Sequence, residues 1–238
     1  MTAGPGEGVL ALFDIDGTLL IAGDPAHRAA FDHALQTVYR VPATVDGVPL
    51  AGMLDRSIAR QALANQGVGA GAADARLDEM VATMGDHYTA AVPPGAHIER
   101  LLPGVVEAAA ALRAAGVALA VVTGTARPVA RAKLEAAHLA DLFPTGAYGD
   151  EADNRADLVG HGIAAAERFY DRPFDPGRAV VIGDTPRDVE AARGAGTRVV
   201  GVATGAVSRA VLAAARPDVL LDDLADWAAV VAAVVGCS

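Results

Sequence analysis

The amino-acid sequence predicts an α/β fold, a doubly wound parallel sheet with a small all-helical domain inserted into it. Short apolar runs, each long enough for one buried strand, alternate along most of the chain with alanine-rich helical stretches. This alternation is typical of a parallel sheet with helices on both faces. One segment, residues 23–97, has helical patterns but no run typical of a buried strand. We therefore expect it to form a separate helical domain, inserted after the first strand.

The boundaries of the elements follow from this alternation. We expect strands at residues 9–13, 117–122, 179–183, 198–202 and 218–221. We expect helices around the sheet at residues 105–115, 128–138, 156–170, 186–195 and 207–215. In the inserted segment we expect helices at residues 26–39, 54–65 and 73–91, separated by turn-rich stretches. The sheet domain then comprises residues 1–22 and 98–238, and the inserted domain residues 23–97, with hinges at Gly23 and residues 93–95.

The composition restricts the partners and the compartment. With 29 acidic and 19 basic residues among 238, the formal net charge is −10, which disfavours nucleic acid and anionic membranes as partners. The single cysteine, Cys237, allows no intrachain disulfide and fits a reducing cytoplasm. The first residues lack the pattern of a signal peptide, and the uncharged apolar stretches fall short of the roughly 20 residues that span a bilayer. We expect a cytoplasmic protein, either a monomer or a homodimer.

Two acidic residues follow the first predicted strand. Asp14 and Asp16 lie on the same side of an extended backbone, and Gly17 allows the chain to turn sharply after them. Neighbouring carboxylates at a strand end repel each other unless a cation lies between them. A hard divalent cation with oxygen ligands is the simplest solution. The alternative is an ordinary turn in which both carboxylates are solvated.

The second predicted strand of the sheet domain ends in a hydroxyl followed by glycine, at Thr123 and Gly124. A threonine hydroxyl, with the backbone N–H groups of a strand-to-helix turn, can hold a phosphate oxygen. The alternative is that Thr123 only caps the next helix.

The third predicted strand of the sheet domain ends at Asp184, and Asp188 follows it in the first turn of the next helix. Asp184 could face the same cation as Asp14, with Asp188 supporting the site. The alternatives are N-capping by Asp184 and a favourable interaction of Asp188 with the helix dipole. Because the carboxyl ends of parallel strands meet at one edge of a sheet, the three strand ends should converge.

Three motifs in this order, FDIDGTL at residues 13–19, VVTGT at 121–125 and IGDTPRD at 182–188, resemble those of the haloacid dehalogenase superfamily of phosphohydrolases. The inserted helical segment resembles the helical cap domain of this superfamily, found in phosphoglycolate phosphatases, β-phosphoglucomutases and phosphonatases. The resemblance spans nearly the whole chain and implies a Rossmann-like core with the active site at the carboxyl edge of the sheet.

The resemblance implies a role for each motif residue. Asp14 would be the nucleophile that forms an aspartyl-phosphate, and Asp16 the general acid and base. Thr123 and Gly124 would bind the transferring phosphoryl group. The ligands of Mg²⁺ would be Asp14, the backbone carbonyl of Asp16, Asp184 and, in support, Asp188.

The family also uses a basic residue, usually lysine, to screen the nucleophile and the phosphate. At the expected distance after the second motif this chain has Arg155, which can supply the charge through a planar fork. Lys133, the only lysine, is the alternative. Its place in the middle of a predicted helix is more typical of a solvated surface charge.

The resemblance also indicates the reaction. A carboxylate at position 16 suits hydrolysis of phosphate esters, since metal-free dehalogenases and phosphonatases of the superfamily carry another residue there. We expect a Mg²⁺-dependent phosphatase of a small phosphorylated metabolite, a sugar or organic-acid phosphate such as phosphoglycolate. The alternatives are a β-phosphoglucomutase-like isomerase and a degenerate, non-catalytic member.

The inserted segment offers fewer indications. Asp55 is most simply an N-cap of its helix. Arg56 could reach a second anion of the substrate or lie on the helix surface, and nothing distinguishes Arg28.

Overall fold

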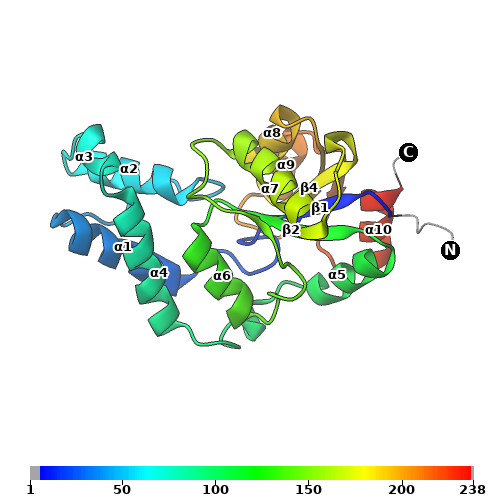
Figure 1. Ribbon diagram of the computed structural model, residues 1–238, viewed down its shortest axis with the longest axis horizontal. Coiled ribbons are helices and arrows are strands. Elements are labelled where there is room, and N and C mark those ends of the chain that lie inside the picture. The colour runs from blue at the N-terminus through cyan, green and yellow to red at the C-terminus, as the bar shows by residue number, and fades with distance from the viewer. Residues whose placement is uncertain (1–5, 237–238) are drawn as a thin grey trace.

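The computed structural model describes residues 6–236, so Cys237 and the first five residues lie outside the described part of the chain. A six-stranded sheet has the order β3-β2-β1-β4-β5-β6, with all neighbouring strands parallel. The strands are β1 (Leu10–Phe13), β2 (Ala118–Val122), β3 (Gly146–Ala147), β4 (Ala179–Gly183), β5 (Arg198–Val202) and β6 (Val219–Leu221). The predicted α/β class is confirmed (Figure 1).

The central strand β1 brings the three motif-bearing strand ends together. It lies between β2 and β4, and its last residue, Phe13, pairs with Val121 on one side and Ile182 on the other. The next residues of all three strands therefore leave the sheet at the same edge. All of β1 is buried, which explains why its sequence is continuously apolar rather than alternating.

Helices cover both faces of the sheet, and alternate strand residues pack against each face. Ala11 and Phe13 belong to the apolar cluster that packs against α5 (Val105–Ala114), α6 (Arg127–Ala136) and α10 (Trp227–Val235). Leu10 and Leu12 point to the opposite face. That face packs against α7 (Arg155–Tyr170), α8 (Pro186–Gly194) and α9 (Arg209–Ala214). Two short 3-10 helices, at Ile98–Arg100 and Pro176–Arg178, complete the core.

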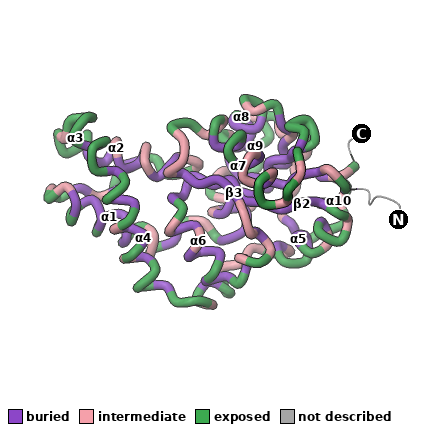
Figure 2. Tube along the Cα trace, in the orientation of Figure 1, coloured by how far each residue is buried: buried purple, intermediate pink, exposed green. Residues whose placement is uncertain are grey.

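The inserted segment between β1 and β2 is helical, as predicted, and we call its four helices and their loops the cap. The helices are α1 (Pro25–Tyr39), α2 (Asp55–Asn65), α3 (Ala70–Asp74) and α4 (Leu77–Ala91). They lie at one end of the molecule, beyond the carboxyl ends of the strands (Figure 1). The cap has its own buried interior (Figure 2). That apolar cluster also includes Val129 and Ala132 of α6, so the cap packs directly on the core.

The structure corrects the predicted elements in two places. The edge strand β3 is only two residues long and was missed. The single helix expected at residues 73–91 is two helices, α3 and α4, interrupted at Ala75 and Arg76. The domain boundaries at residues 23 and 97 stay a prediction. Among the residues that the structure describes, no helix is long and apolar enough to cross a membrane.

Candidate active site

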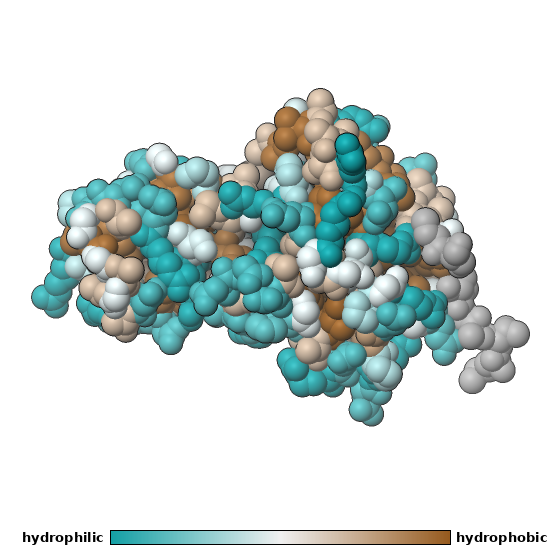
Figure 3. Space-filling view, turned by 90° about the horizontal axis from the view of Figure 1, so that it is seen from above, coloured by the Kyte–Doolittle hydropathy of each residue, from teal (hydrophilic) through white to brown (hydrophobic). Residues whose placement is uncertain are grey.

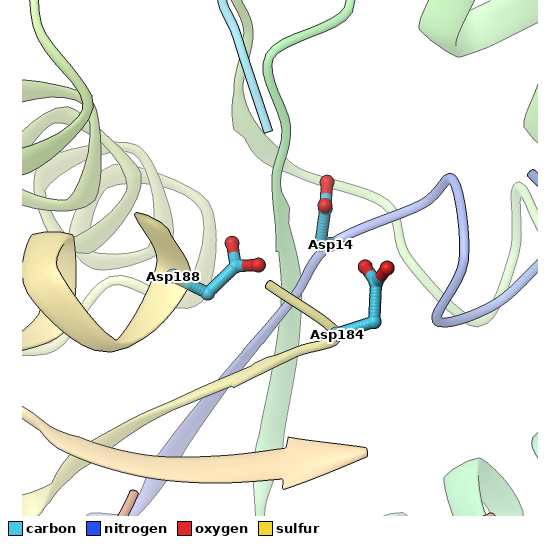
Figure 4. Close-up of side chains that lie close together, drawn as sticks. All are labelled: Asp14, Asp184 and Asp188. Atoms are coloured by element: carbon cyan, nitrogen blue, oxygen red, sulfur yellow. The ribbon is translucent and has the colours of Figure 1, made fainter. Parts of the chain in front are cut away.

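Three carboxylates converge at the edge where the strands end. Asp14 follows β1, Asp184 follows β4, and Asp188 lies in the first turn of α8. One oxygen from each lies within 4.8 Å of the others, and all three residues are buried (Figure 4). Asp184 is not an N-cap, because Thr185 occupies that position. Asp188 accepts hydrogen bonds from the backbone N–H and hydroxyl of Thr185, at 3.0 and 2.7 Å, which fixes its carboxylate.

The electrostatics of this cluster favour binding of a cation. Burial raises the pKa of Asp14 to about 6, with Arg155 acting in the opposite direction and Asp188 adding to the rise. Burial and the charges of Asp14 and Asp188 raise the pKa of Asp184 to about 8. Buried carboxylates that repel one another in this way are a donor set suited to a hard divalent cation.

Arg155, at the first position of α7, supplies a positive charge to the cluster. Its guanidinium lies 2.9 Å from Asp14 and 2.5 Å from Asp188 and donates to the carbonyl of Gly52 in the cap at 3.3 Å. Burial alone would lower the pKa of Arg155, but the two carboxylates raise it, so the guanidinium stays charged. Of the two basic residues considered above, Arg155 is the one beside Asp14.

Two glycines allow the chain to approach Asp184 closely. A Cβ atom at Gly17 or at Gly205 would overlap the Asp184 carboxylate. Gly17 also has a φ of 91°, which disfavours other residues. The hydroxyl of Thr204 donates to the carbonyl of Gly17 at 2.6 Å and links the loop after β5 to the loop after β1.

Lys133 is not a solvated surface residue, so that interpretation is wrong. It is 0% exposed, and its ammonium donates to both oxygens of Asp16, at 2.7 and 2.6 Å. Burial alone would raise the pKa of Asp16, but Lys133 lowers it below its usual value, and a hydrogen bond from Thr125 acts in the same direction. The two basic residues therefore bind different carboxylates, Arg155 at Asp14 and Lys133 at Asp16.

A hydrogen-bonded chain that the sequence did not indicate links Lys133 to the cap. The ammonium also donates to His27 Nδ1, at 3.2 Å, and His27 Nε2 lies 3.2 Å from Asp55. Because an ammonium can only donate, Nδ1 must accept and Nε2 must carry the proton that it donates to Asp55. Both ring nitrogens of His27 are thus engaged.

Asp55 joins the cap to the loop after β2. Leu54, not Asp55, is the N-cap of α2, so the predicted capping role is wrong. The Asp55 carboxylate instead accepts from the N–H of Ala126 at 2.8 Å, and its own N–H donates to the carbonyl of Gly124 at 2.8 Å. A Cβ atom at Gly124 would overlap the carbonyl of Met53. The cap is therefore closed onto this loop.

Thr123 does not cap α6, because Ala126 is the N-cap. It is 1% exposed, and its hydroxyl oxygen accepts from the N–H of Thr125 at 3.2 Å, so the hydroxyl hydrogen is free to point elsewhere. This hydrogen bond within the loop helps to fix its conformation.

A cavity of about 420 Å³ lies between the core and the cap. The predicted site residues that line it are Asp14, Asp16, Thr123, Gly124, Arg155 and Asp184. Asp188 and Lys133 lie behind this wall and contact residues of it. His27 and Thr125, for which no role was predicted, also line the cavity.

The fold and the site described above are those of a family of hydrolases. A model of the haloacid dehalogenase-like hydrolases matches residues 10–196, and the chain belongs to that family. A phosphoglycolate phosphatase of Agrobacterium fabrum is 30% identical over 218 residues, which cover 91% of this chain and 89% of that protein. One of Shigella sonnei is 27% identical over 90% of this chain and 88% of that protein.

Solved structures show the same fold. A variant of CbbY from Rhodobacter sphaeroides, in complex with xylulose-(1,5)bisphosphate, is 25% identical with a TM-score of 0.61 and covers 92% of this chain and 96% of that one. A β-phosphoglucomutase from Clostridium difficile has a TM-score of 0.68 at 14% identity, with 91% of each chain covered.

Proposed function

We propose that the protein is a Mg²⁺-dependent phosphatase that hydrolyses small phosphomonoesters through an aspartyl-phosphate at Asp14. The observation that carries the proposal is the placement of Asp14. Its carboxylate lines the cavity, lies 2.9 Å from the Arg155 guanidinium and shares one buried cluster with Asp184 and Asp188. The similarity to phosphoglycolate phosphatases over about nine-tenths of the chain supports the same class of reaction.

The buried carboxylates fit a divalent cation. Asp14, Asp184 and the backbone carbonyl of Asp16 would hold Mg²⁺, and Asp188 would support it. When bound, Mg²⁺ would neutralise charge on the carboxylates and on the phosphate.

In the first step, an oxygen of Asp14 attacks the phosphorus and the bond from phosphorus to the alcohol oxygen breaks. To act as the acid, Asp16 must first take up a proton, against the effect of the Lys133 ammonium. The alcohol oxygen takes this proton, which leaves an aspartyl-phosphate and a neutral alcohol. In the second step, water attacks the phosphorus and gives a proton to the Asp16 carboxylate. The bond to Asp14 breaks and inorganic phosphate leaves.

The remaining residues bind and orient the phosphoryl group. The Thr123 hydroxyl and the N–H groups near Gly124 would donate to its oxygens, and Arg155 would face them from the Asp14 side. Lys133 would act through Asp16, whose two oxygens it holds.

We also propose that residues 23–97 move as one cap. Gly23 has a φ of 74°, and residues 93–95 form the return to the core, so both connections suit a hinge. Closure would exclude water from the cavity during the reaction.

A screen for phosphate release over a broad panel of phosphomonoesters, with and without Mg²⁺, tests this function. We expect release that stops on addition of EDTA, and a covalent phosphoenzyme that Asp14→Asn cannot form. Full activity of Asp14→Asn would show that the mechanism is wrong. Turnover that needs a sugar bisphosphate activator and releases no phosphate would favour the mutase.

A further inference from the structure

The two ends of the 420 Å³ cavity differ in chemistry. The end in the core contains Asp14, Thr123 and Arg155, the groups proposed to act on phosphate. The end formed by the cap is apolar over much of its wall. The apolar side chains on that wall are Phe31, Val45, Leu50, Met53 and Ile58. Because the phosphoryl group must reach Asp14, the cap end receives the leaving group.

The cap end has little positive charge to offer a second anion. Arg28 is its only lysine or arginine among the described residues that line the cavity. Its guanidinium pairs with Asp46, and its side chain is 47% exposed. His27 also lines the cavity, but both of its ring nitrogens are engaged, by Lys133 and Asp55. Arg56 does not line the cavity and pairs with Asp78.

Two carboxylates lie at the same end. Asp24 accepts hydrogen bonds from the N–H of Ala26 at 3.0 Å and from the hydroxyl of Tyr88 at 2.7 Å. Asp55 is 2% exposed and accepts from the N–H of Ala126. Burial alone would raise the pKa of Asp24, but the hydrogen bond from Tyr88 and the other donors and positive charges around it lower it below its usual value. Negative charge at this end would repel an anionic leaving group.

We propose that the preferred substrates are phosphomonoesters of uncharged alcohols with substantial apolar surface, a refinement that rests on the proposed phosphatase activity. Apolar walls gain free energy by covering apolar surface of the leaving group. The cavity also lies within the range of roughly 300–1,000 Å³ that accommodates larger organic ligands. Phosphoglycolate carries a carboxylate on a two-carbon leaving group, and xylulose bisphosphate carries a second phosphate. Neither anion would meet an unpaired cation here.

Matched pairs of esters test the proposal on the wild-type enzyme with Mg²⁺. One pair is benzyl phosphate and 4-carboxybenzyl phosphate, and the other is n-butyl phosphate and phosphoglycolate. We expect kcat/KM to be higher for the uncharged member by at least roughly tenfold in each pair. Equal values, or a preference for the carboxylate, would overturn the proposal.

Variants of a residue that lines the cap end of the cavity test whether charge causes the preference. Leu50 is 40% exposed, so Leu50→Arg can be accommodated without burying the new charge. We expect it to raise kcat/KM for 4-carboxybenzyl phosphate and reduce the preference by roughly tenfold. Leu50→Gln, which is polar but uncharged, should not produce this gain. An equal gain in both variants would argue against charge as the determinant.

Arg28→Gln tests the alternative that Arg28 leaves Asp46 and binds an anionic group of the substrate. We expect the ratio of kcat/KM within each pair to stay unchanged in this variant. A selective loss for the carboxylate-bearing esters would identify Arg28 as an anion anchor and overturn the proposal.

The outcomes also separate this inference from the function on which it rests. If the wild type hydrolyses no ester in either pair or in the broad panel, the phosphatase function fails, and the inference fails with it. If hydrolysis proceeds through Asp14 but favours anionic esters, only the inference about the leaving group fails.

Discussion

Replacing Lys133 with methionine tests the buried ion pair with Asp16. Methionine keeps much of the apolar stem but removes the ammonium, which lies 2.6 and 2.7 Å from the two oxygens of Asp16. Unit charges about 3 Å apart attract by roughly 5–6 kcal/mol at an effective dielectric constant of about 20. Removing one partner of a buried pair costs about 3–5 kcal/mol, because the other charge stays behind unpaired.

The expected loss lies at the lower end of that range. The Asp16 side chain is 28% exposed, so water partly solvates its carboxylate in the variant, and Thr125 still donates to it at 3.1 Å. We therefore expect Lys133→Met to lower the free energy of unfolding by about 3 kcal/mol. Since each kcal/mol shifts the midpoint of a domain of this size by about 2–4 °C, thermal unfolding should occur about 6–12 °C lower.

Equilibrium urea denaturation measures the change, with Arg209→Met as the control. Arg209 lies 3.0 Å from Asp222, but the two side chains are 51% and 82% exposed, so the loss there should stay below about 1 kcal/mol. A double-mutant cycle with Asp16→Asn should give a coupling of about 2–3 kcal/mol between positions 16 and 133. If Lys133→Met loses less than about 0.5 kcal/mol, as ordinary surface substitutions do, the reasoning from burial is wrong.

Three further results are expected. Gly124→Ala should lower kcat strongly in a phosphate-release assay, because its Cβ would overlap the carbonyl of Met53 in the closed cap. The control Gly160→Ala should be fully active, because no atom lies within 4 Å of the added Cβ. Equal activities of the two variants would contradict the closed geometry. Mg²⁺ at about 100 times its Kd should stabilise the wild type by about 2.7 kcal/mol in thermal unfolding, and Asp184→Ala should lose this gain if that carboxylate binds the ion. Burial raises the pKa of every tyrosine in the chain, so the tyrosines of the folded protein should titrate at higher pH, in the ultraviolet absorbance, than those of the urea-unfolded chain. The free energy of unfolding should also fall above about pH 10, where only the unfolded state ionises. Coincident titrations of the folded and unfolded protein would contradict this. The tyrosines are Tyr39, Tyr88, Tyr148 and Tyr170.

The strands and the edge where they end could be predicted because their signals are local. A continuously apolar run such as that of β1 can be buried on both faces only in a parallel sheet covered by helices. The polar residues directly after such runs must then share an edge, which is why Asp14 and Asp184 could be placed together. By contrast, β3 consists of Gly146 and Ala147 and has no apolar run. Its pairing with β2 is a consequence of tertiary packing, which a local pattern does not contain.

The contacts between the cap and the core could not be predicted in the same way. His27 and Asp55 lie in the cap, and Lys133 lies in the core. Asp55 is 28 residues and Lys133 is 106 residues from His27 in the sequence. Helical periodicity defines which face of each helix is apolar, but it does not define how two domains dock. The predicted capping role of Asp55 failed for this reason, since its partner, the N–H of Ala126, belongs to the other domain.

The burial of Lys133 could have been predicted, because its neighbours on the helix are apolar. The residues three and four positions away in the sequence are Val129, Ala130, Ala136 and Ala137, and all are buried. Ala130 and Ala137 pack in the cluster of the core, and Val129 and Ala136 in that of the cap. A charge among apolar neighbours on one helix face is buried, and so it must be paired.

The pairing also explains why this position carries the only lysine in a chain whose other basic residues are all arginine. The site offers three acceptors, the two oxygens of Asp16 and Nδ1 of His27. An ammonium has three N–H donors, and each finds a partner here, whereas the five donors of a guanidinium would exceed the acceptors. Unsatisfied donors are costly where no water reaches them. The preference for lysine therefore follows from the number of acceptors at this site, and base composition alone does not account for it.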